Sequence, residues 1–330
     1  MSAARHPLKH VSVHLGRTVA TMSPLLFVAL LGVAAIAILS SDFYLKEVLV
    51  LVIVFAQFTA SWDVLCGYSA QDNFGHAFFI GAAGYVAALL YTWLEFSPWL
   101  TVPLSAGVAA LLGVGVGWLT LRLRGPYFAL STIAFAAVLF KLAYIFSTVT
   151  GGEEGISGIA PFSSSVDLDL FTCVVIFAIS TILLCAFVRS HYGLILRSTQ
   201  HNEDAAQASG INTAYYKIAG FVVSGFFAGI GGTMYTHTKM QVNPELLAGS
   251  LSVLIVLFAV AGGRGSIMGP VFAAAGLTLL NEWLRIIEEY RPVLFTGTLI
   301  LLIYFNPSGM VRSRALARVP WLRTLLFGRQ

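Results

Sequence analysis

The chain consists of long apolar runs separated by short polar segments. Because about 20 apolar residues cross a bilayer as a helix, this pattern predicts an all-α polytopic membrane protein with about ten transmembrane helices. The runs lie at about 24–39, 48–66, 76–94, 99–121, 126–149, 170–188, 215–236, 250–261, 270–287 and 292–305. Basic residues before the first run also suit a signal peptide, but no convincing small-x-small cleavage site precedes Asp42, so we expect a slightly short first span.

Composition supports a membrane protein. Hydrophobic residues make up 58% of the chain and charged residues 10%, with a mean hydropathy of +0.84, whereas charged residues are about a quarter of an ordinary soluble domain. The three cysteines, Cys66, Cys173 and Cys185, all lie inside apolar runs and show neither a disulfide framework nor a metal-ligand spacing. We therefore expect core cysteines and no metal site.

Charged residues separate according to the predicted topology. With both termini in the cytoplasm, ten spans place most cations inside: Arg5, Lys9, Arg17, Arg122, Arg124, Arg189, Arg197, Lys217, Arg264, Arg312, Arg314, Arg318, Arg323 and Arg329. Most acids then fall outside, among them Asp42, Glu47, Glu153, Glu154, Asp167, Asp169 and Glu282. This positive-inside bias predicts a cytoplasmic tail at 1–23, a transmembrane domain at 24–305 with a cytoplasmic loop at 189–217, and a cytoplasmic tail at 306–330.

The loop at 189–217 is the long polar segment that is rich in cations, and it contains a predicted short helix. Asn202 suits the N-cap, acids follow in the first turn, and Gly210 suits a left-handed stop. The alanines keep the backbone close to the surface, so a partner protein is able to clasp the helix in a groove. We expect Ala206 on the exposed face and expect force to reach the membrane domain through Glu203, Asp204, Ala205, Ala206 and Gly210.

Two glycine-flanked segments, near 67–75 and 262–270, interrupt the apolar pattern. Interrupted helices are tolerated at membrane depth where they are buried in protein or line a watery cavity. The polar residues in and around the first segment are therefore candidates for the substrate pathway, or else for a local structural role. They are Asp63, Gln71, Asp72, Asn73 and His76.

Two further observations bear on function. The chain has no Gly-x-x-x-x-Gly-Lys-[Ser/Thr] phosphate loop, so we expect no nucleotide hydrolysis by this chain and no enzymatic role. The segment 150–159 forms the longest acidic outer loop and is either a docking surface or a solvated turn.

Four stretches together resemble one family. They are Gly67-Tyr68 to Gly75-His76 with Gly81 and Gly84-Tyr85; Leu-Arg-Leu-Arg-Gly-Pro-Tyr-Phe-Ala-Leu at 121–130; Thr150-Gly151-Gly152 with Gly155; and the acid-Ala-Ala pattern ending at Gly210 together with the glycine-rich run at 262–270. In this order they look like the branched-chain amino-acid ABC importer permeases, and the second stretch is similar to the M-type subunit. The resemblance covers about 45–312, and its structural motif residues are Arg122, Arg124, Gly125, Pro126, Gly262, Gly263, Gly265, Gly269 and Pro270.

This resemblance implies a permease subunit in the bacterial inner membrane that forms the pathway for branched-chain or hydrophobic amino acids, or for a related urea, amide or aromatic carboxylate. It also implies an H-type permease partner, two cytoplasmic ATPases that bind the ATP, an external solute-binding protein, surrounding lipid, no nucleic acid and no cofactor in this chain. The sequence departs from the family at 72–74, where Asp, Asn and Phe replace the usual apolar residue, Ser and Leu, and at Ala70, where Gly is usual. The alternative is a self-contained secondary transporter with a broken-helix site at the membrane midplane.

Overall fold

The computed structural model describes residues 42–120, 123, 125–306 and 309. The predicted N-terminal tail at 1–23, the first span at 24–39, Arg122, Arg124 and all of the C-terminal tail except 306 and 309 lie outside the described residues. The described part of the chain is helical apart from turns and one short strand pair, which confirms the all-α prediction.

Within the described residues, six helices are long and apolar enough to cross a membrane. They are α2 (Phe43–Ser69), α3 (His76–Leu94), α4 (Pro98–Thr120), α5 (Pro126–Ile145), α7 (Val166–Arg189) and α10 (Thr213–Lys239). Three shorter helices occupy the last three predicted runs: α11 (Gly249–Gly262), α12 (Met268–Trp283) and α13 (Arg291–Phe305). The structure thus supports a multi-pass membrane protein, and a total of ten spans stays a prediction.

The remaining elements are short. They are α6 (Ser147–Thr150), α8 (His191–His201), α9 (Glu203–Ala208), the 3₁₀ helices η1 (Pro244–Leu247) and η2 (Leu284–Tyr290), and the strands β1 (Ile156–Ser157) and β2 (Gln241–Val242). The fifth predicted run, 126–149, divides at Phe146 into α5 and α6. Helix α8 is an amphipathic element that the sequence analysis did not predict.

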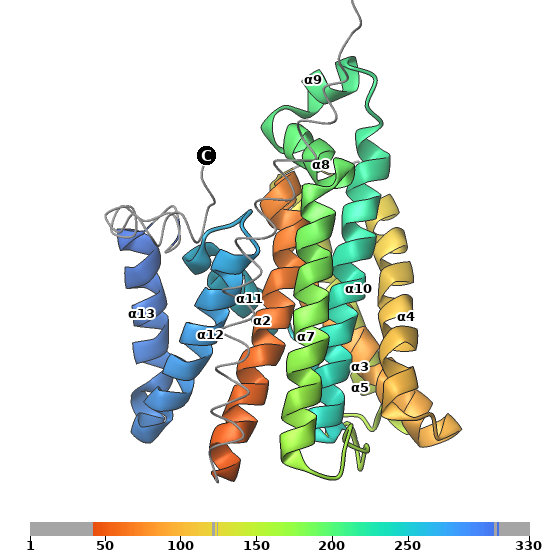
Figure 1. Ribbon diagram of the computed structural model, residues 1–330. Helices are drawn as coiled ribbons and strands as arrows, with labels where there is room; N and C mark the ends of the chain where they lie inside the picture. Colours follow the sequence, from red (N-terminus) through yellow and green to blue (C-terminus); the bar gives the residue numbers. More distant parts are fainter. Residues whose placement is uncertain (1–41, 121–122, 124, 307–308, 310–330) are drawn as a thin grey trace, which may run out of the picture.

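Helix α10 lies at the centre of the bundle and packs against α2, α3 and α4 (Figure 1). Its glycines allow this close approach: a Cβ atom on Gly232 would lie 2.1 Å from the Ile80 carbonyl oxygen of α3. A Cβ on Gly229 would lie 2.8 Å from the Cβ of Ala109 in α4. Because lipid tails are as apolar as leucine, close van der Waals contact between small residues is what favours helix association here.

Both predicted interruptions are present. Helix α2 ends at Ser69 and α3 begins at His76, and α11 ends at Gly262 before α12 begins at Met268. In Figure 1, α8 and α9 lie together at one end of the bundle, which we call the α8–α9 end. The end at which α2 and α7 begin lies opposite.

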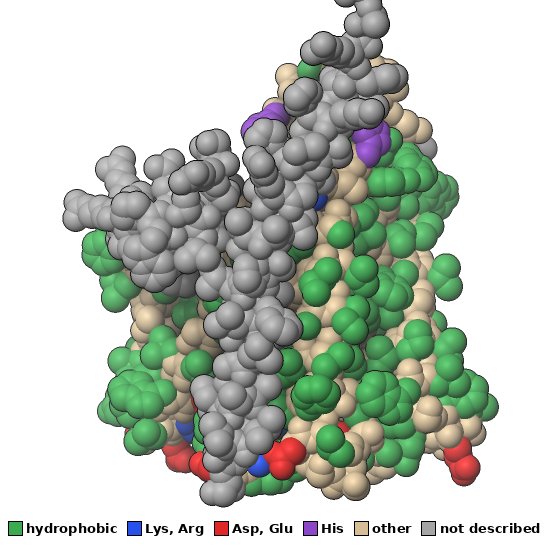
Figure 2. All heavy atoms as spheres, in the orientation of Figure 1, with side chains coloured by type: hydrophobic (Ala, Val, Ile, Leu, Met, Phe, Trp, Pro, Cys, Tyr) green, Lys and Arg blue, Asp and Glu red, His purple; other side chains and the backbone are tan. Residues whose placement is uncertain are grey.

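The opposite end holds the acidic loop at 150–159. Strand β1 pairs antiparallel with β2, and a Cβ on Gly155 would lie 2.0 Å from the Val242 carbonyl oxygen. The loop is therefore folded onto the bundle, with Glu153 and Glu154 exposed. Figure 2 shows carboxylates along this end and hydrophobic side chains over the face between the two ends, as a bilayer-spanning protein requires.

Candidate functional site

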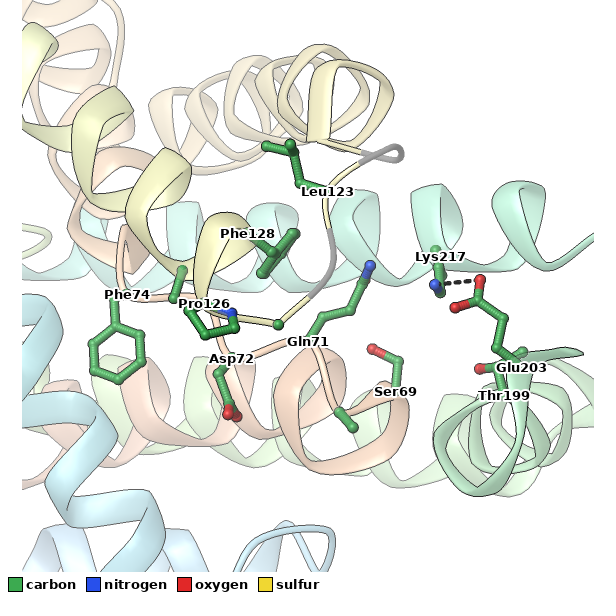
Figure 3. Close-up of a pocket in the computed structure, with 13 residues that line it drawn as sticks. Ser69, Gln71, Asp72, Phe74, Leu123, Pro126, Phe128, Thr199, Glu203 and Lys217 are labelled. Carbon is green, nitrogen blue, oxygen red and sulfur yellow. Dashed lines mark hydrogen bonds and ion pairs between the residues drawn. The ribbon is translucent and has the colours of Figure 1, made fainter.

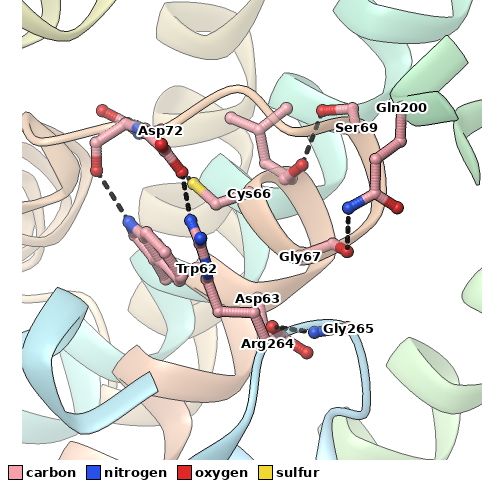
Figure 4. A network of polar contacts seen from close by, with 11 residues as sticks. Trp62, Asp63, Cys66, Gly67, Ser69, Asp72, Gln200, Arg264 and Gly265 are labelled. Atoms are coloured by element: carbon pink, nitrogen blue, oxygen red, sulfur yellow. Dashed lines mark hydrogen bonds and ion pairs between the residues drawn. The ribbon is translucent and has the colours of Figure 1, made fainter. Parts of the chain in front are cut away.

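The second interruption is held against α2 by the buried carboxylate of Asp63. This side chain is fully buried in α2 and accepts hydrogen bonds from the backbone N–H groups of Gly265, Ser266 and Ile267 at 2.7, 3.1 and 2.8 Å. Figure 4 shows the contact with Gly265. A buried carboxylate is costly unless it is paired or hydrogen-bonded, and these three donors supply that compensation. Asp63 therefore holds the turn between α11 and α12 against α2, and it does not line the cavity described below.

Glycine is needed where this turn crosses α2. Gly265 has φ = +77°, and a Cβ there would lie 2.7 Å from the Gly67 carbonyl oxygen. Gly262 and Gly269 face each other across the turn, where a Cβ on Gly262 would lie 2.2 Å from the Gly269 carbonyl oxygen. Gly309 packs against Gly263 from the C-terminal side. A side chain at Gly265 would push the turn away from α2, and one at Gly262 or Gly269 would force the end of α11 and the start of α12 apart.

Asn73 and His76 also have local partners. The Asn73 carbonyl accepts from the Trp62 indole at 2.7 Å, and the Asn73 side-chain Oδ1 accepts from the Gly75 N–H at 2.8 Å. The His76 ring is fully buried and its Nε2 lies 2.9 Å from the Ser61 hydroxyl. These contacts fasten the loop at 70–75 along α2, so both residues serve the structure of the interruption.

Asp72 connects the two interruptions at their exposed edge. Its Oδ1 lies 2.6 Å from Nη1 of Arg264, and the two side chains are 48% and 46% exposed. Pairing with the guanidinium of Arg264 compensates the negative charge of this pathway candidate. The pair is exposed, so it contributes little to stability.

A cavity of about 460 Å³ lies at the α8–α9 end, between the loop at 70–75, the start of α5 and the α8–α9 segment (Figure 3). Gly125, with φ = +57°, turns the chain into this site, and Pro126 begins α5 as predicted. The lining residues are Ser69, Ala70, Gln71, Asp72, Phe74, Leu123, Gly125, Pro126, Phe128, Ala129, Thr199, Glu203 and Lys217. Of the five pathway candidates, the structure places Gln71 and Asp72 at the cavity.

Gln71 is the polar side chain of the loop that enters the cavity. It is 8% exposed, and its Oε1 has no hydrogen-bond partner among the described residues. Figure 3 shows the side chain reaching toward the side on which Glu203 and Lys217 lie. A buried polar atom without a partner costs about 1–3 kcal/mol, so this acceptor is a local cost of the folded loop.

Helix α8 connects this site to the end of α2. Ile195 and Leu196 are buried, and the Gln200 amide donates to the Gly67 carbonyl at 3.2 Å. The Arg197 guanidinium lies 4.6 Å from the ring centroid of Tyr68, a cation–π contact. Helix α8 therefore contacts, through both side chains, the segment of α2 that precedes the interruption.

Helix α9 is connected to α10. As predicted, the Asn202 side chain caps it by accepting from the Ala205 N–H at 3.0 Å, and Gly210 has φ = +82°. Glu203 Oε1 lies 2.5 Å from Nζ of Lys217 and accepts from the Thr213 hydroxyl at 3.2 Å. With side chains only 22% and 10% exposed, the Glu203–Lys217 pair ties α9 to the first turns of α10.

The predicted orientation of Ala206 is wrong. Ala206 is 6% exposed and faces the chain itself, where its carbonyl accepts from the Ile211 N–H. The exposed positions of α9 are Asp204, Ala205, Gln207 and Ala208. The capping of the helix at both ends sets its rotation, which alanine spacing alone does not reveal.

Sequence reasoning did not identify Thr199, Lys217 or Arg264 as site residues. Lys217 and Arg264 were placed only as cytoplasmic cations, although Arg264 is the one charged residue of the glycine-rich run at 262–270. A cation in an otherwise uncharged interruption is a usable signal for an ion pair. No sequence signal indicated the Glu203–Lys217 pair, because these residues belong to different helices.

Comparison with known proteins agrees with this architecture. A family model described as "Branched-chain amino acid transport system / permease component" matches residues 44–303. No solved structure matches the chain significantly.

Three relatives illustrate the range of similarity. The chain is 27% identical to the high-affinity branched-chain amino acid transport system permease protein LivM of Salmonella typhimurium and 26% identical to LivM of Escherichia coli. Each match covers 76% of this chain and 65% of the relative, so the chain spans slightly less than two thirds of their length. It is also 22% identical to the ribose import permease protein RbsC of Haemophilus influenzae, over 63% of this chain and 67% of that relative.

Proposed function

The chain belongs to the family of branched-chain amino acid transport system permease components, and from this membership we propose that it is the transmembrane permease subunit of an ATP-driven importer in the bacterial inner membrane. Its role is to form part of the translocation pathway. Catalysis of a covalent step is not part of that role, and ATP is bound and hydrolysed by partner subunits.

The observation that carries the proposal is the double attachment of the α8–α9 segment. Glu203 ties α9 to Lys217 of α10, and Gln200 ties α8 to Gly67 of α2. A short helix with two alanines on its exposed face, Ala205 and Ala208, suits a groove in a partner protein. Force on that face would reach both the central helix and the helix that precedes the first interruption.

In this mechanism, two ATPases close on nucleotide and move α9. The displacement passes through the Glu203–Lys217 pair to α10 and through α8 to α2, and the membrane domain changes the side to which its pathway opens. An H-type permease forms the other half of the pathway, and an external solute-binding protein delivers the solute. The broad hydrophobic exposure of α4 and α5 suits lipid and the partner permease.

The solute we propose is a branched-chain or other hydrophobic amino acid, with urea, an amide or an aromatic carboxylate as related alternatives. Two relatives are named for branched-chain amino acids and one for ribose, so similarity supports a small polar solute more firmly than a particular one. The α8–α9 attachment favours this importer over a self-contained secondary transporter, which has no need of a partner-binding helix.

The test is co-purification in mild detergent. Expression of the tagged chain with its neighbouring transporter subunits is expected to recover a second permease and two ATPase chains. If no ATPase is recovered, and the purified chain in liposomes accumulates solute under an ion gradient alone, the secondary-transporter reading replaces this proposal.

A further inference from the structure

Five aromatic rings from three helices form one cluster at the α8–α9 end. They come from the end of α7, the start of α8 and the first turn of α10, which lie side by side in Figure 1: Phe187, His191, Tyr192, Tyr215 and Tyr216. The ring centroid of Tyr192 lies 6.0 Å from that of Phe187 and 5.4 Å from that of Tyr216. The Tyr215 ring lies against Tyr216 at 5.3 Å. This aromatic cluster therefore fastens the start of α8 to the ends of α7 and α10.

The aromatic cluster is open on one side. Tyr215 is 55% exposed and Tyr192 is 37% exposed. Their hydroxyl groups lie 3.4 Å apart and share one hydrogen bond, so the second O–H is left to donate to an acceptor that none of the described residues supplies. An occupant of this surface has to cover apolar rings and also accept a hydrogen bond. The boundary between lipid tails and headgroups offers both, and tyrosine is enriched there.

The level of the aromatic cluster along the helices matches a bilayer surface. The hydrocarbon core is about 30 Å thick, which a helix crosses in about 20 residues. On α7 no Asp, Glu, Lys or Arg lies between Asp169, near the opposite end, and Arg189 at the cluster. On α10 none lies between Lys217, beside the cluster, and Lys239 at the opposite end. Both uncharged runs have bilayer length, so the cluster lies where the two helices leave the hydrocarbon core.

The apolar surface of α7 leads directly to the aromatic cluster. Ile179 and Leu183 are 54% and 51% exposed, and together with Phe187 they recur every four residues, so the three side chains lie along one face. Two further exposed aromatic side chains lie at the same end of the bundle, Trp118 near the end of α4 and Tyr127 near the start of α5. Exposed aromatic rings at the ends of apolar helices are typical of the membrane interface. Lipid tails suit the apolar face of α7, and lipid headgroups then lie against the cluster.

We propose that the aromatic cluster is a lipid-headgroup binding surface, which seats the first turn of α8 in the membrane interface. The rings lie among the uppermost parts of the lipid tails, and a tyrosine hydroxyl donates to a phosphate or ester oxygen of the lipid. Helix α8 leaves the membrane surface toward α9, and through Gln200 and Arg197 it contacts the end of α2. The lipid contact therefore fixes the position of the helix that joins α9 to α2. It depends on the chain being a membrane protein and not on its proposed role in import.

Depth measurement by electron paramagnetic resonance tests this surface. The full chain, without ATPases, is placed in nanodiscs of phosphatidylcholine and phosphatidylglycerol, with a nitroxide on one introduced cysteine and the labelled parent chain as background. Tyr215→Cys reports the cluster, Ile182→Cys the apolar face of α7 and Gln207→Cys the exposed face of α9. Relaxation by oxygen, which concentrates in lipid, relative to relaxation by a water-soluble nickel chelate is expected to place Tyr215→Cys between the other two positions. The same accessibility to nickel at Tyr215→Cys and Gln207→Cys would overturn the proposal, because the cluster would then lie in water.

Addition of phosphatidylglycerol to the detergent-purified chain is a second test. A lipid that binds the folded chain raises its unfolding temperature. This rise is expected to be smaller in Tyr215→Ser than in the parent chain, whereas Tyr215→Trp, which keeps a ring with one polar N–H, should retain it. An equal rise in the parent chain and in folded Tyr215→Ser would also contradict the proposal. If Tyr215→Ser does not fold, a nitroxide at the exposed His191→Cys, which leaves all three tyrosines in place, decides by the same depth comparison.

Discussion

Three carboxylates near the interruptions have different roles because their surroundings differ. Asp63 is fully buried and holds three backbone N–H groups. Asp72 is half exposed and paired with Arg264, and Glu203 is mostly buried and paired with Lys217. Burial and hydrogen-bond partners, more than residue type, decide the role of each carboxylate. Asp63 holds a turn in place, Asp72 forms an exposed ion pair, and Glu203 connects two helices.

Replacement of Asp63 by Asn tests the structural role. The amide has one oxygen in place of two, and its NH₂ group would face a backbone N–H, so we expect a loss of about 1–3 kcal/mol in stability. The shift in the thermal unfolding midpoint in detergent measures this loss of stability. Asp72→Asn is the matched control and should change stability by less than about 1 kcal/mol. Equal shifts in the two variants would contradict the role of Asp63.

Asp72 also bears on selectivity. Because Arg264 already neutralises its carboxylate, Asp72→Leu is expected to leave the ranking of transported amino acids, amides and carboxylates unchanged. Uptake of a labelled panel measures this ranking, with the affinity of the binding protein determined alongside. A changed ranking at unchanged binding-protein affinity would show that Asp72 contacts the solute.

At the scale of elements, α9 is too short to be stable alone and depends on its attachments. An isolated helix needs about 12–15 residues to be even marginally stable in water, whereas α9 has six. The Asn202 cap and the Glu203–Lys217 pair therefore fix both its presence and its rotation. An element held in this way moves together with the helices that hold it.

Alanine substitutions distinguish the two faces of α9. Ala205→Glu places a charge on the exposed face, where a partner groove would have to desolvate it, so transport and ATPase association should fall while the chain stays folded. Ala206→Glu forces a charge into a buried position and should lower the thermal stability of the purified chain. Full transport by Ala205→Glu would show that this face binds no partner.

Glu203→Gln weakens the attachment of α9 to α10 without adding volume. We expect ATP hydrolysis by the assembled importer to continue while the amount of solute transported per ATP falls, because the displacement no longer passes to α10. Asp72→Asn, which removes a paired carboxylate from the loop at 70–75 and leaves the Glu203–Lys217 pair intact, is the control for lost negative charge at this end. Parallel loss of hydrolysis and transport in Glu203→Gln would argue against a connecting role.

At the scale of the whole molecule, the two ends of the bundle differ. Glu47, Asp167 and Glu282 lie at the end opposite α8 and α9, where Lys46, Lys239 and Arg291 pair with them. The α8–α9 end carries the cation-rich segment at 189–217. Positive residues favour the cytoplasmic side, so we propose that the α8–α9 end is inside.

Thiol labelling tests this orientation. A cysteine at the exposed Ser164 should react with an impermeant reagent added to intact cells, whereas one at the exposed Ser198 of α8 should react only after the cells are opened. Labelling of the parent protein gives the background from its native cysteines, of which Cys66 and Cys173 are buried and Cys185 is partly buried. Labelling of Ser198→Cys from outside would reverse the proposed orientation.

The sequence by itself determined the helical class, most helix positions, both interruptions and the caps of α9. These features depend on local signals: apolar length set by the bilayer, glycine and proline at breaks, and side chains that bind their own backbone. The resemblance to the family also came from motifs that remain readable along the chain.

Only the tertiary structure decided what the polar residues do. Asp63 binds the turn at 265–267, Asp72 pairs with Arg264, and Glu203 pairs with Lys217. The partners in each contact belong to different elements, so the periodic pattern of a single helix does not reveal them. Ala206 was assigned to the wrong face because rotation about a short helix axis depends on what clamps it. Local patterns fix the elements, whereas partners and burial, which come from packing, fix the chemistry of each side chain.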